Sequence, residues 1–381
     1  MFVIKKDNMK KKILIVIDTL ASGGAQKLSL NLAKGLIKKS FDVEIFVYET
    51  TNDEFNFFNS EFKKLNIKLR TVKTKGNKRF FKKLKIIFEL RKLIKSDYNS
   101  IISFLHIPSI YSSLAKIGLK KCKLTVCELS SSNAPVKPYI RLMFYIACFL
   151  SDNVVANSYS ESRRIAKNFF LSNKVHPIWN GFNTQASKYN NLHTIKDISK
   201  KILIVARVAY PKNGLNLLKG LNKFLENNNW APEISWYGRN EIDNRSINMQ
   251  NEMKKYLLEN PKLNHYFKFC GESKDIDSLY MSYDALILPS IYEGLPLVIC
   301  EAMLSNCFVI ASNVCDHPLI LGQNTRGLLF EPNSPESIAT SLNNFYSLSE
   351  KNRSRIINEA KEFANENFAI NKMVDSFEKL F

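Results

Sequence analysis

Residues 284–303 of this chain read DALILPSIYEGLPLVICEAM, and this stretch decides the fold. Its first part, Ala285–Leu288, predicts a buried strand, because short continuous apolar runs are typical of parallel sheets that are covered on both faces. A loop follows, and Pro296 is well placed to begin a helix, since its missing N–H falls where no intrahelical hydrogen bond is made. The order strand, loop, helix predicts one unit of a parallel α/β sheet.

The same order recurs on both sides of this stretch. Short apolar runs separated by helical patterns predict strands over residues 12–17, 43–48, 100–104, 124–127, 153–156, 201–206, 234–237, 267–270 and 308–311. The polar, turn-rich residues 183–200 separate two such series. We therefore expect an α/β protein of two doubly wound domains, in which ligands bind beyond the carboxyl ends of the strands.

Positive charge is concentrated in the first half of the chain. The 381 residues are 45% apolar and 24% charged, a globular composition that excludes a disordered or fibrous protein. Residues 1–190 hold 34 Lys and Arg against 13 Asp and Glu, whereas residues 191–381 hold 21 against 22. A nucleic-acid binder is one alternative, but the sequence has no helix-turn-helix, zinc module or RNP-like motif. We therefore expect no nucleic-acid partner.

Cysteine and histidine usage indicates neither a disulfide framework nor a metal site. The seven cysteines are scattered without a C-x-x-C pair, and the five histidines lack ligand spacing. This pattern favours a reducing compartment. The longest nearly apolar stretch, residues 140–150, is far shorter than a membrane span, and no secretory cleavage pattern follows the first apolar run. A cytoplasmic protein is predicted.

Two loops carry residues suited to phosphate groups. Arg207 and Lys212 follow the strand that opens the second half, where an Arg fork and a Lys point charge suit a diphosphate. The alternative is a solvated loop with ordinary surface cations. Gly23, Gly24 and Ala25 follow the first strand and open a helix, where glycine lets the backbone approach a ligand. The alternative there is a plain tight turn.

Two carboxylates flank the helix start at Pro296. Glu293 lies in the loop before the helix, and Glu301 lies one to two turns inside an otherwise apolar helix. A carboxylate in such surroundings is costly without a partner, and ribose hydroxyls are a suitable one. The amides near Leu297 and Val298 have no intrahelical acceptor and are available to a ligand at the strand ends.

These motifs together resemble the retaining glycosyltransferases of family 4. The landmarks follow the family's order over about residues 10–365: Gly23-Gly24-Ala25, Arg207 with Lys212, Gly238, Gly271 and an E-x7-E motif from Glu293 to Glu301. The resemblance implies a GT-B fold of two facing Rossmann-like domains with a central cleft. It is strongest to bacterial enzymes that build surface polysaccharides, such as lipopolysaccharide or capsule, or lipid-linked oligosaccharides.

The resemblance also implies residue roles and domains. Arg207, Lys212 and Glu293 would be catalytic, with the two cations on the diphosphate and Glu293 on the donor sugar, while Glu301 would bind the ribose. Predicted substrate contacts also include Gly23, Gly24, Ala25, Gly238, Cys270, Gly294, Leu295, Pro296, Leu297 and Val298. The implied domains are residues 1–182 for the acceptor, a linker at 183–200, residues 201–365 for the nucleotide sugar, and a helix at 366–381 that packs back on the first domain.

The implied reaction moves a hexose or N-acetylhexosamine from a nucleotide sugar, with UDP as the expected nucleotide. The expected acceptor is lipid-linked or an oligosaccharide. No metal and no cofactor are expected besides the donor.

Two positions depart from the family pattern. Many members have a histidine at the end of the strand over residues 124–127, where this chain has Glu128. Glu128 is interpreted as an acceptor-side or sugar-contacting residue; the alternative is a strand-end carboxylate in water. Residues Asp316-His317-Pro318-Leu319 lack the family's glutamate. This departure keeps open a second alternative, a sugar- or lipid-binding protein of the same fold without activity.

Residues 78–95 predict a basic amphipathic helix. Phe80, Phe81, Leu84, Ile87, Phe88 and Ile94 are expected largely on one face, with lysines and arginines around them. This composition is typical of a helix that lies at a membrane surface. The alternative is a domain helix whose apolar stripe packs on the sheet. The pattern predicts a peripheral enzyme that binds anionic lipid at the inner face of the cell membrane.

Overall fold

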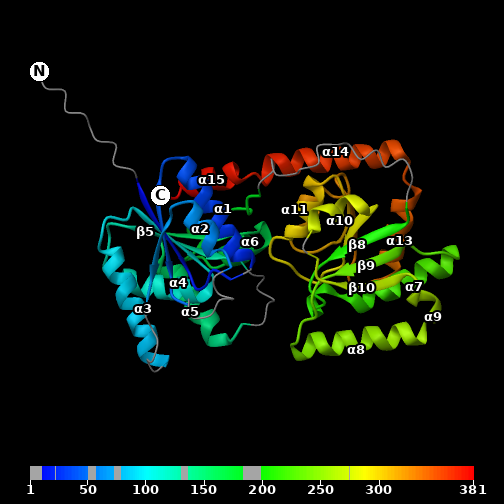
Figure 1. Ribbon diagram of the computed structural model, residues 1–381, viewed down its shortest axis with the longest axis horizontal. Coiled ribbons are helices and arrows are strands. Elements are labelled where there is room, and N and C mark those ends of the chain that lie inside the picture. Colours follow the sequence, from blue (N-terminus) through cyan, green and yellow to red (C-terminus); the bar gives the residue numbers. More distant parts are fainter. Residues whose placement is uncertain are drawn as a thin grey trace, which may run out of the picture. The chain divides into compact units, whose positions relative to one another are not determined.

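The computed structural model describes residues 11–21, 23–49, 57–72, 79–129, 136–182, 199–273 and 275–381. The chain divides into two compact units, Met1–Phe182 with Ile370–Phe381, and Asn183–Ala369. Helix α15 (Ile370–Glu378) belongs to the first unit and lies beside α1 (Gly24–Lys38) (Figure 1). Residues 183–198, most of the expected linker, lie outside the described residues.

The first unit is built on a seven-stranded parallel sheet of order β3-β2-β1-β4-β5-β6-β7. The strands are β1 (Lys12–Ile17), β2 (Asp42–Val47), β3 (Lys68–Thr71), β4 (Ser100–Phe104), β5 (Lys123–Glu128), β6 (Asn153–Ala156) and β7 (Val175–Pro177). The five predicted strands are confirmed. Strands β3 and β7 were not predicted, because these short, partly exposed strands have no continuous apolar run.

Helices cover both faces of this sheet, and β1 shows why. Ile13, Ile15 and Ile17 point into a core shared with α1 and α15, whereas Leu14 and Val16 point into the opposite core. This is the period of two that a strand imposes on its side chains. The other helices are α2 (Asn59–Lys64), α3 (Arg79–Ile94), α4 (His106–Lys116), α5 (Pro138–Leu150) and α6 (Tyr159–Ala166).

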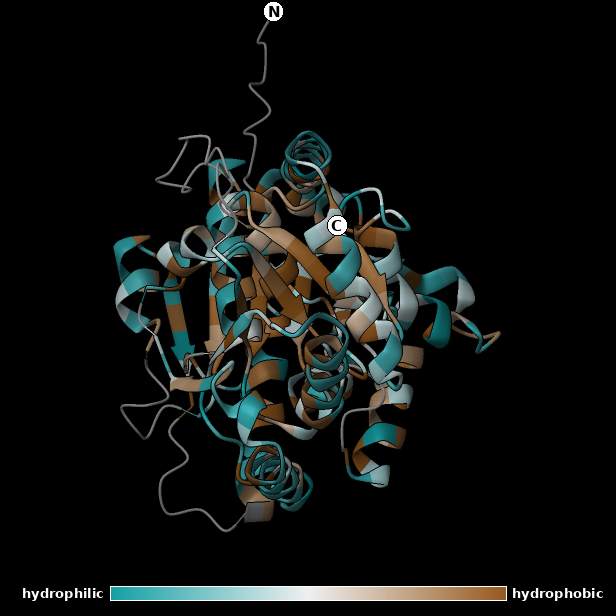
Figure 2. Ribbon diagram, turned by 90° about the vertical axis from the view of Figure 1, so that its right-hand side faces the viewer, coloured by the Kyte–Doolittle hydropathy of each residue, from teal (hydrophilic) through white to brown (hydrophobic). Residues whose placement is uncertain are grey.

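The second unit has a six-stranded parallel sheet of order β10-β9-β8-β11-β12-β13. Its strands are β8 (Lys201–Val205), β9 (Glu233–Tyr237), β10 (Phe267–Gly271), β11 (Ala285–Leu288), β12 (Phe308–Ser312) and β13 (Leu328–Phe330). The strands are mostly hydrophobic, and the helices turn hydrophilic sides outward (Figure 2). The helices are α7 (Gly214–Asn228), α8 (Asn244–Glu259), α9 (Pro261–Asn264), α10 (Ile276–Ser282), α11 (Leu297–Leu304), α12 (His317–Ile320), α13 (Pro335–Ser347) and α14 (Glu350–Asn367).

Both sheets reverse their strand order at one point, between β1 and β4 and between β8 and β11. In open parallel sheets, ligands bind beyond the carboxyl ends of the strands at such a switch point. The loop after β8 carries Arg207 and Lys212, and the loop after β11 carries Glu293. The sheet order therefore places these two loops next to each other.

Helix α3 corrects the expectation of a single apolar face. Ile86, Leu90 and Ile94 are buried in the core of the first unit, whereas Phe81 and Phe88 are exposed. Ile94 thus does not share a face with the aromatic residues, because the spacing of four residues places it with Ile86 and Leu90 on the opposite side. The helix packs on the sheet and also presents aromatic side chains outward.

Candidate functional site

The loops after β8 and β11 meet in the second unit. After β8 the chain passes Arg207 and forms a short 3-10 helix, Tyr210–Lys212, before α7 begins. The backbone N–H of Ile291, in the loop after β11, donates to the carbonyl of Pro211 at 2.8 Å. This hydrogen bond ties the loop of Lys212 to the loop of Glu293.

Lys212 and Glu293 form an ion pair at this junction. The Lys212 ammonium donates to Oε1 of Glu293, and the Ser290 hydroxyl donates to the same oxygen at 2.6 Å. Burial alone would raise the pKa of Glu293, but the charge and hydrogen bond of Lys212 outweigh it and hold this pKa below its usual value. The side chain is therefore a carboxylate near neutral pH. Both hydrogen bonds involve Oε1 of Glu293, and no described residue forms a hydrogen bond with its second carboxylate oxygen, Oε2.

Cys315, which directly precedes the segment that departs from the family pattern, contacts this loop. The backbone N–H of Glu293 donates to Sγ of Cys315 at 3.4 Å, and His317 is completely buried. The Nδ1 of His317 lies 2.7 Å from the Ser312 carbonyl, to which it donates. Its Nε2 is then an acceptor, and it has no hydrogen-bond partner among the described residues. Burial lowers the pKa of His317, which keeps the imidazole neutral.

Arg207 lies at the same edge with a partner of its own. Its guanidinium pairs with Glu241 and remains about half exposed, at 55% of its side-chain surface. Glu241 is positioned through its backbone N–H, which donates to the carbonyl of Val208 at 3.2 Å. Each of the two predicted diphosphate-binding cations therefore bonds a carboxylate of its own unit.

Gly238 occupies a position that excludes a side chain. Its φ is 155°, and a Cβ there would overlap the carbonyl oxygen of Ala206. Its N–H donates to the carbonyl of Gly271 at 2.7 Å, which joins the ends of β9 and β10. Cys270 is exposed on β10, the edge strand of this sheet.

Helix α11 begins one residue later than expected. Pro296 is the N-cap and Leu297 the first helical residue, so the expectation that Pro296 begins the helix is wrong by one position. The Pro296 carbonyl accepts from Ile299 and Cys300, at 3.1 and 3.4 Å. Leu297 and Val298 are the first-turn residues, whose amides have no acceptor within a helix. Of the two residues before Pro296, Gly294 is partly exposed and Leu295 is buried.

Glu301 has a partner within the chain. The hydroxyl of Tyr280, on α10, donates to Oε2 of Glu301 at 3.1 Å. Burial, together with the nearby Glu301, raises the pKa of Tyr280 well above its usual value, so the hydroxyl keeps its proton. Tyr280 is therefore one partner of the Glu301 carboxylate, which needs one in its apolar helix turn. The spacing of residues in the sequence did not identify it.

In the first unit, Glu128 is buried at the end of β5 and is only 4% exposed. The alternative of a strand-end carboxylate in water is therefore wrong. Its Oε2 lies 2.7 Å from Nε2 of His106, the first residue of α4, whose ring packs edge-on against Phe144 at 4.5 Å. The structure thus brings a histidine, His106, to the strand end where the family histidine is missing.

The remaining predicted residues of the first unit lie at the start of α1. Gly23 is the N-cap of this helix, which begins at Gly24 and continues through Ala25. Ser22, which precedes them, lies outside the described residues. Over the described part of the chain, no three His, Cys, Asp or Glu side chains are grouped as a metal site would require.

Comparison with known proteins identifies the family. Residues 22–186 match the model described as Glycosyltransferase Family 4, and residues 187–363 match Glycosyl transferases group 1. The chain belongs to this family of GT-B glycosyltransferases. It is a glycosyltransferase of the group 1 type.

Individual relatives agree with this assignment. An uncharacterized glycosyltransferase of Methanocaldococcus jannaschii is 28% identical over 216 residues, and the match spans 52% of each chain. A Campylobacter jejuni enzyme is 26% identical over 92% of this chain and 93% of its own. Its name is GalNAc-alpha-(1->4)-GalNAc-alpha-(1->3)-diNAcBac-PP-undecaprenol alpha-1,4-N-acetyl-D-galactosaminyltransferase.

Solved structures show the same fold. A glycosyltransferase from Rickettsia africae is 22% identical over 98% of each chain, with a TM-score of 0.78. Anabaena HepE in complex with UDP and glucose is 16% identical, over 97% of this chain and 98% of its own, with a TM-score of 0.77.

The Arg207–Glu241 pair generates a first prediction. On the sequence-based expectation that Arg207 binds the diphosphate of UDP, Glu241→Gln should tighten UDP binding about two- to fivefold, because the diphosphate would no longer compete with a carboxylate for Arg207 and an exposed ion pair is worth up to about 1 kcal/mol. Isothermal titration with UDP measures the effect. Glu233→Gln, which removes the exposed Lys268–Glu233 pair of the same unit, is the matched control and should leave the affinity unchanged. Equal affinities for all three proteins would show that Glu241 does not restrain Arg207.

Proposed function

We propose that this chain is a retaining, metal-independent glycosyltransferase. In this proposal it transfers a hexose or N-acetylhexosamine from a UDP sugar to a lipid-linked or polysaccharide acceptor. The observation that carries the proposal is the Lys212–Glu293 pair, which two tied loops hold at the switch point of the second sheet. A cation and a carboxylate in this place are suited to the two ends of a sugar diphosphate.

The proposed donor contacts follow from the charges. Lys212 and Arg207 stabilise the negative charge that develops on the diphosphate as the glycosidic bond breaks, and such preorganised charge is usually the largest catalytic contribution. Glu293 keeps Oε2 available to a hydroxyl of the transferred sugar. Glu301 faces the ribose hydroxyls, and the amides of Leu297 and Val298 face phosphate or sugar oxygens. Support for UDP comes from HepE, which was solved with UDP and glucose.

Metal independence is proposed because the two cations supply the positive charge that a diphosphate leaving group needs. No cofactor is proposed besides the donor. The retaining outcome rests on the resemblance to family 4.

The acceptor is proposed to bind the first unit. Glu128 and His106 form a hydrogen-bonded pair at the carboxyl edge of that sheet, where they would contact the acceptor or the transferred sugar. The name of the Campylobacter relative places its acceptor on undecaprenol diphosphate, which supports a lipid-linked acceptor here.

A peripheral position at the inner face of the cell membrane is also proposed. No helix in the described ranges combines the length and the apolar character that a bilayer span requires. On α3, Lys85 and Lys92 lie on the same side as Phe81 and Phe88, with Lys92 over the Phe88 ring at 4.6 Å. Cations of this kind attract anionic lipid by about 1 kcal/mol each near the surface. Nucleic acid is not a proposed partner.

The second candidate function is a sugar-binding protein of the same fold without activity. It is favoured by one observation, the altered segment at Asp316 and His317, which follows Cys315, the residue whose Sγ accepts a hydrogen bond from the backbone N–H of Glu293. Turnover of a nucleotide sugar separates the two candidates.

Thermal-shift measurements against a panel of nucleotide sugars test the proposal. A UDP sugar at 100 times its dissociation constant should stabilise the protein by about 2.7 kcal/mol, and the matching free sugar should have no effect. Release of UDP from that donor, measured with and without a chelator of divalent cations, then tests turnover and metal independence. Binding without turnover, with every acceptor supplied, would favour the inactive candidate.

The cations should affect turnover more than folding. Arg207→Ala and Lys212→Gln should each lower kcat/KM by at least about a hundredfold, since each removes charge from the developing leaving group. The glutamine keeps a hydrogen-bond donor toward partly buried Glu293, and the melting temperature checks that the fold is intact. Lys254→Gln, on the exposed side of α8, is the control with the same loss of charge. Near-normal turnover in either variant would remove that residue from the mechanism.

The two glutamates should differ in what they recognise. Glu301→Gln should weaken binding of free UDP and of the UDP sugar alike, because a ribose contact does not depend on the sugar. Glu293→Gln should weaken binding of the intact donor more than that of free UDP. Isothermal titration with both ligands measures the difference. Parent-like UDP binding by Glu301→Gln would show that its assignment to the ribose is wrong.

A further inference from the structure

Helix α5 carries apolar side chains on both of its sides. Its inner side packs through Phe144, Ala147 and Cys148, which are buried. Its outer side exposes six apolar residues and no charged one: Tyr139, Leu142, Met143, Ile146, Phe149 and Leu150. Leu142 is 63% exposed. Apart from the partly exposed Arg141, α5 is hydrophobic all round, and such a helix is normally covered on all sides, so this outer side indicates a partner.

Two further aromatic residues extend the same surface. Phe169 and Phe170 are 85% and 70% exposed. The Phe170 ring lies 6.3 Å from that of Phe149 and 5.9 Å from that of Phe169, measured between centroids. The exposed apolar residues of α5 together with Phe169 and Phe170 form one surface, here named the α5 face.

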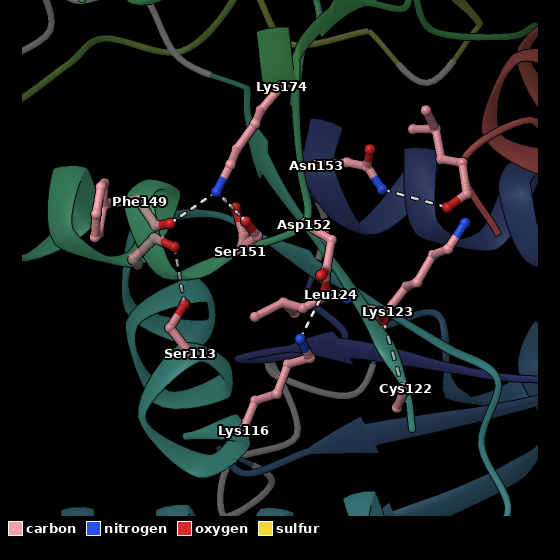
Figure 3. Close-up of polar contacts among 12 residues, drawn as sticks. Ser113, Lys116, Cys122, Lys123, Leu124, Phe149, Ser151, Asp152, Asn153 and Lys174 are labelled. Atoms are coloured by element: carbon pink, nitrogen blue, oxygen red, sulfur yellow. Dashed lines mark hydrogen bonds and ion pairs between the residues drawn. The ribbon is translucent and has the colours of Figure 1, made fainter. Parts of the chain in front are cut away.

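The end of this surface is held in place by Lys174. Its ammonium donates to the carbonyls of Phe149 and Ser151, at 2.9 Å each, and lies 5.7 Å from the centre of the Phe149 ring (Figure 3). A cation on the last carbonyls of a helix stabilises the negative end of its dipole. The exposed ring of Phe149 therefore lies at an anchored helix end, next to Phe170.

The surroundings of the α5 face are positively charged. Lys137 precedes α5 and Lys167 precedes Phe169, and both are exposed. The two carboxylates of residues 136–182 have partners: Asp152 bonds Lys116 at 2.8 Å, and buried Glu161 bonds Arg164 at 2.7 Å. The charge around the apolar residues is thus unbalanced toward positive.

This charge distribution selects the occupant. A second copy of the chain on the α5 face would bring two positive surroundings together, which is unfavourable. An anionic bilayer offers negative headgroups to the lysines and hydrocarbon to the aromatic and aliphatic side chains. Helix α3 lies beyond α4 on the same side of the sheet and adds Lys85, and also Lys92, which pairs with Glu89 at 3.1 Å.

We propose that the α5 face inserts into the boundary between headgroups and acyl chains of an anionic bilayer. Attachment then has two parts, an electrostatic one that salt screens and an apolar one that salt leaves in place. The proposal rests on the proposed function, which places the acceptor on a lipid. It goes further in assigning a particular surface and an apolar mode of attachment.

Vesicle sedimentation with full-length protein tests the proposal. The parent should bind vesicles of phosphatidylcholine and phosphatidylglycerol strongly at low salt, and a measurable part of this binding should persist at about 1 M salt, where the Debye length is about 3 Å. The variant Leu142→Ser/Ile146→Ser/Phe169→Ser should lose at least about tenfold in partition at both salt concentrations, equivalent to about 1.4 kcal/mol.

Two variants serve as controls. Ile242→Ser/Ile247→Ser/Leu258→Ser removes three exposed apolar side chains from the second unit and should bind vesicles like the parent. Lys85→Glu/Lys92→Glu should lose binding at low salt but keep the part that resists salt. Equal binding by the α5 variant and its matched control would overturn the proposal. It would also be overturned by a parent dimer in solution that the α5 variant converts to a monomer, since a second copy would then cover the face.

Fluorescence quenching with a conservative variant tests insertion without removing the apolar side chains, so a loss of folding cannot account for the result. Phe170→Trp preserves an aromatic side chain at an exposed position, and its added fluorescence should be quenched by brominated acyl chains. Leu258→Trp, on the second unit, should not be quenched, and equal quenching would contradict the proposal. Titration of each variant with UDP sugar separates the two proposals. Failure to bind any nucleotide sugar would contradict the proposed function and leave the vesicle result to stand on its own.

Discussion

The pairing of β8 with β11 is the constraint on which the candidate donor site depends. The two parallel strands pair Ile202 with Ala285 and Leu203 with Leu286. At their amino ends, the buried carboxylate of Asp284 accepts hydrogen bonds from the N–H groups of Ser199 and Lys201, at 3.0 and 2.9 Å. At their carboxyl ends, the Ile291–Pro211 hydrogen bond joins the two loops. A one-residue slip would turn every inward side chain outward, so this register is strongly specified.

That register decides the energetics of the partly buried Lys212–Glu293 pair. Burying Glu293 without a cation would be costly, and Lys212 compensates for this cost only because the two loops meet. The same ammonium is the one expected to bind the diphosphate. A bound donor therefore brings a second anion to a cation that already serves a carboxylate. In the proposed donor complex, Arg207, whose partner Glu241 is more exposed than Glu293, would supply the additional charge, and Ser290 would remain within hydrogen-bond distance of Glu293.

Sequence patterns predicted the sheets better than the contacts within the site. The continuous apolar runs identified the buried strands. The sequence did not predict β13, which has only three residues, or the short edge strands β3 and β7 of the first unit. The pairs Lys212–Glu293 and His106–Glu128 join residues 81 and 22 positions apart, and only the strand order brings them together. On α3, an apolar periodicity could not separate a buried aliphatic stripe from an exposed aromatic one, because both consist of hydrophobic residues. The two differ only in which one faces the sheet.

Helix α5 connects the two proposed activities of the first unit. On its inner side, Phe144 packs against the ring of His106, which bonds Glu128. On its outer side lie Leu142 and Ile146 of the α5 face. A helix with its side chains is about 10 Å across. With the α5 face at the lipid boundary, the His106–Glu128 pair would thus lie roughly one helix diameter, ~10 Å, from the acyl chains. A lipid-linked acceptor that leaves the bilayer beside α5 would contact the His106–Glu128 pair with its headgroup and first sugars. The same helix would then determine both how the protein attaches to the membrane and how far from the membrane the acceptor is bound.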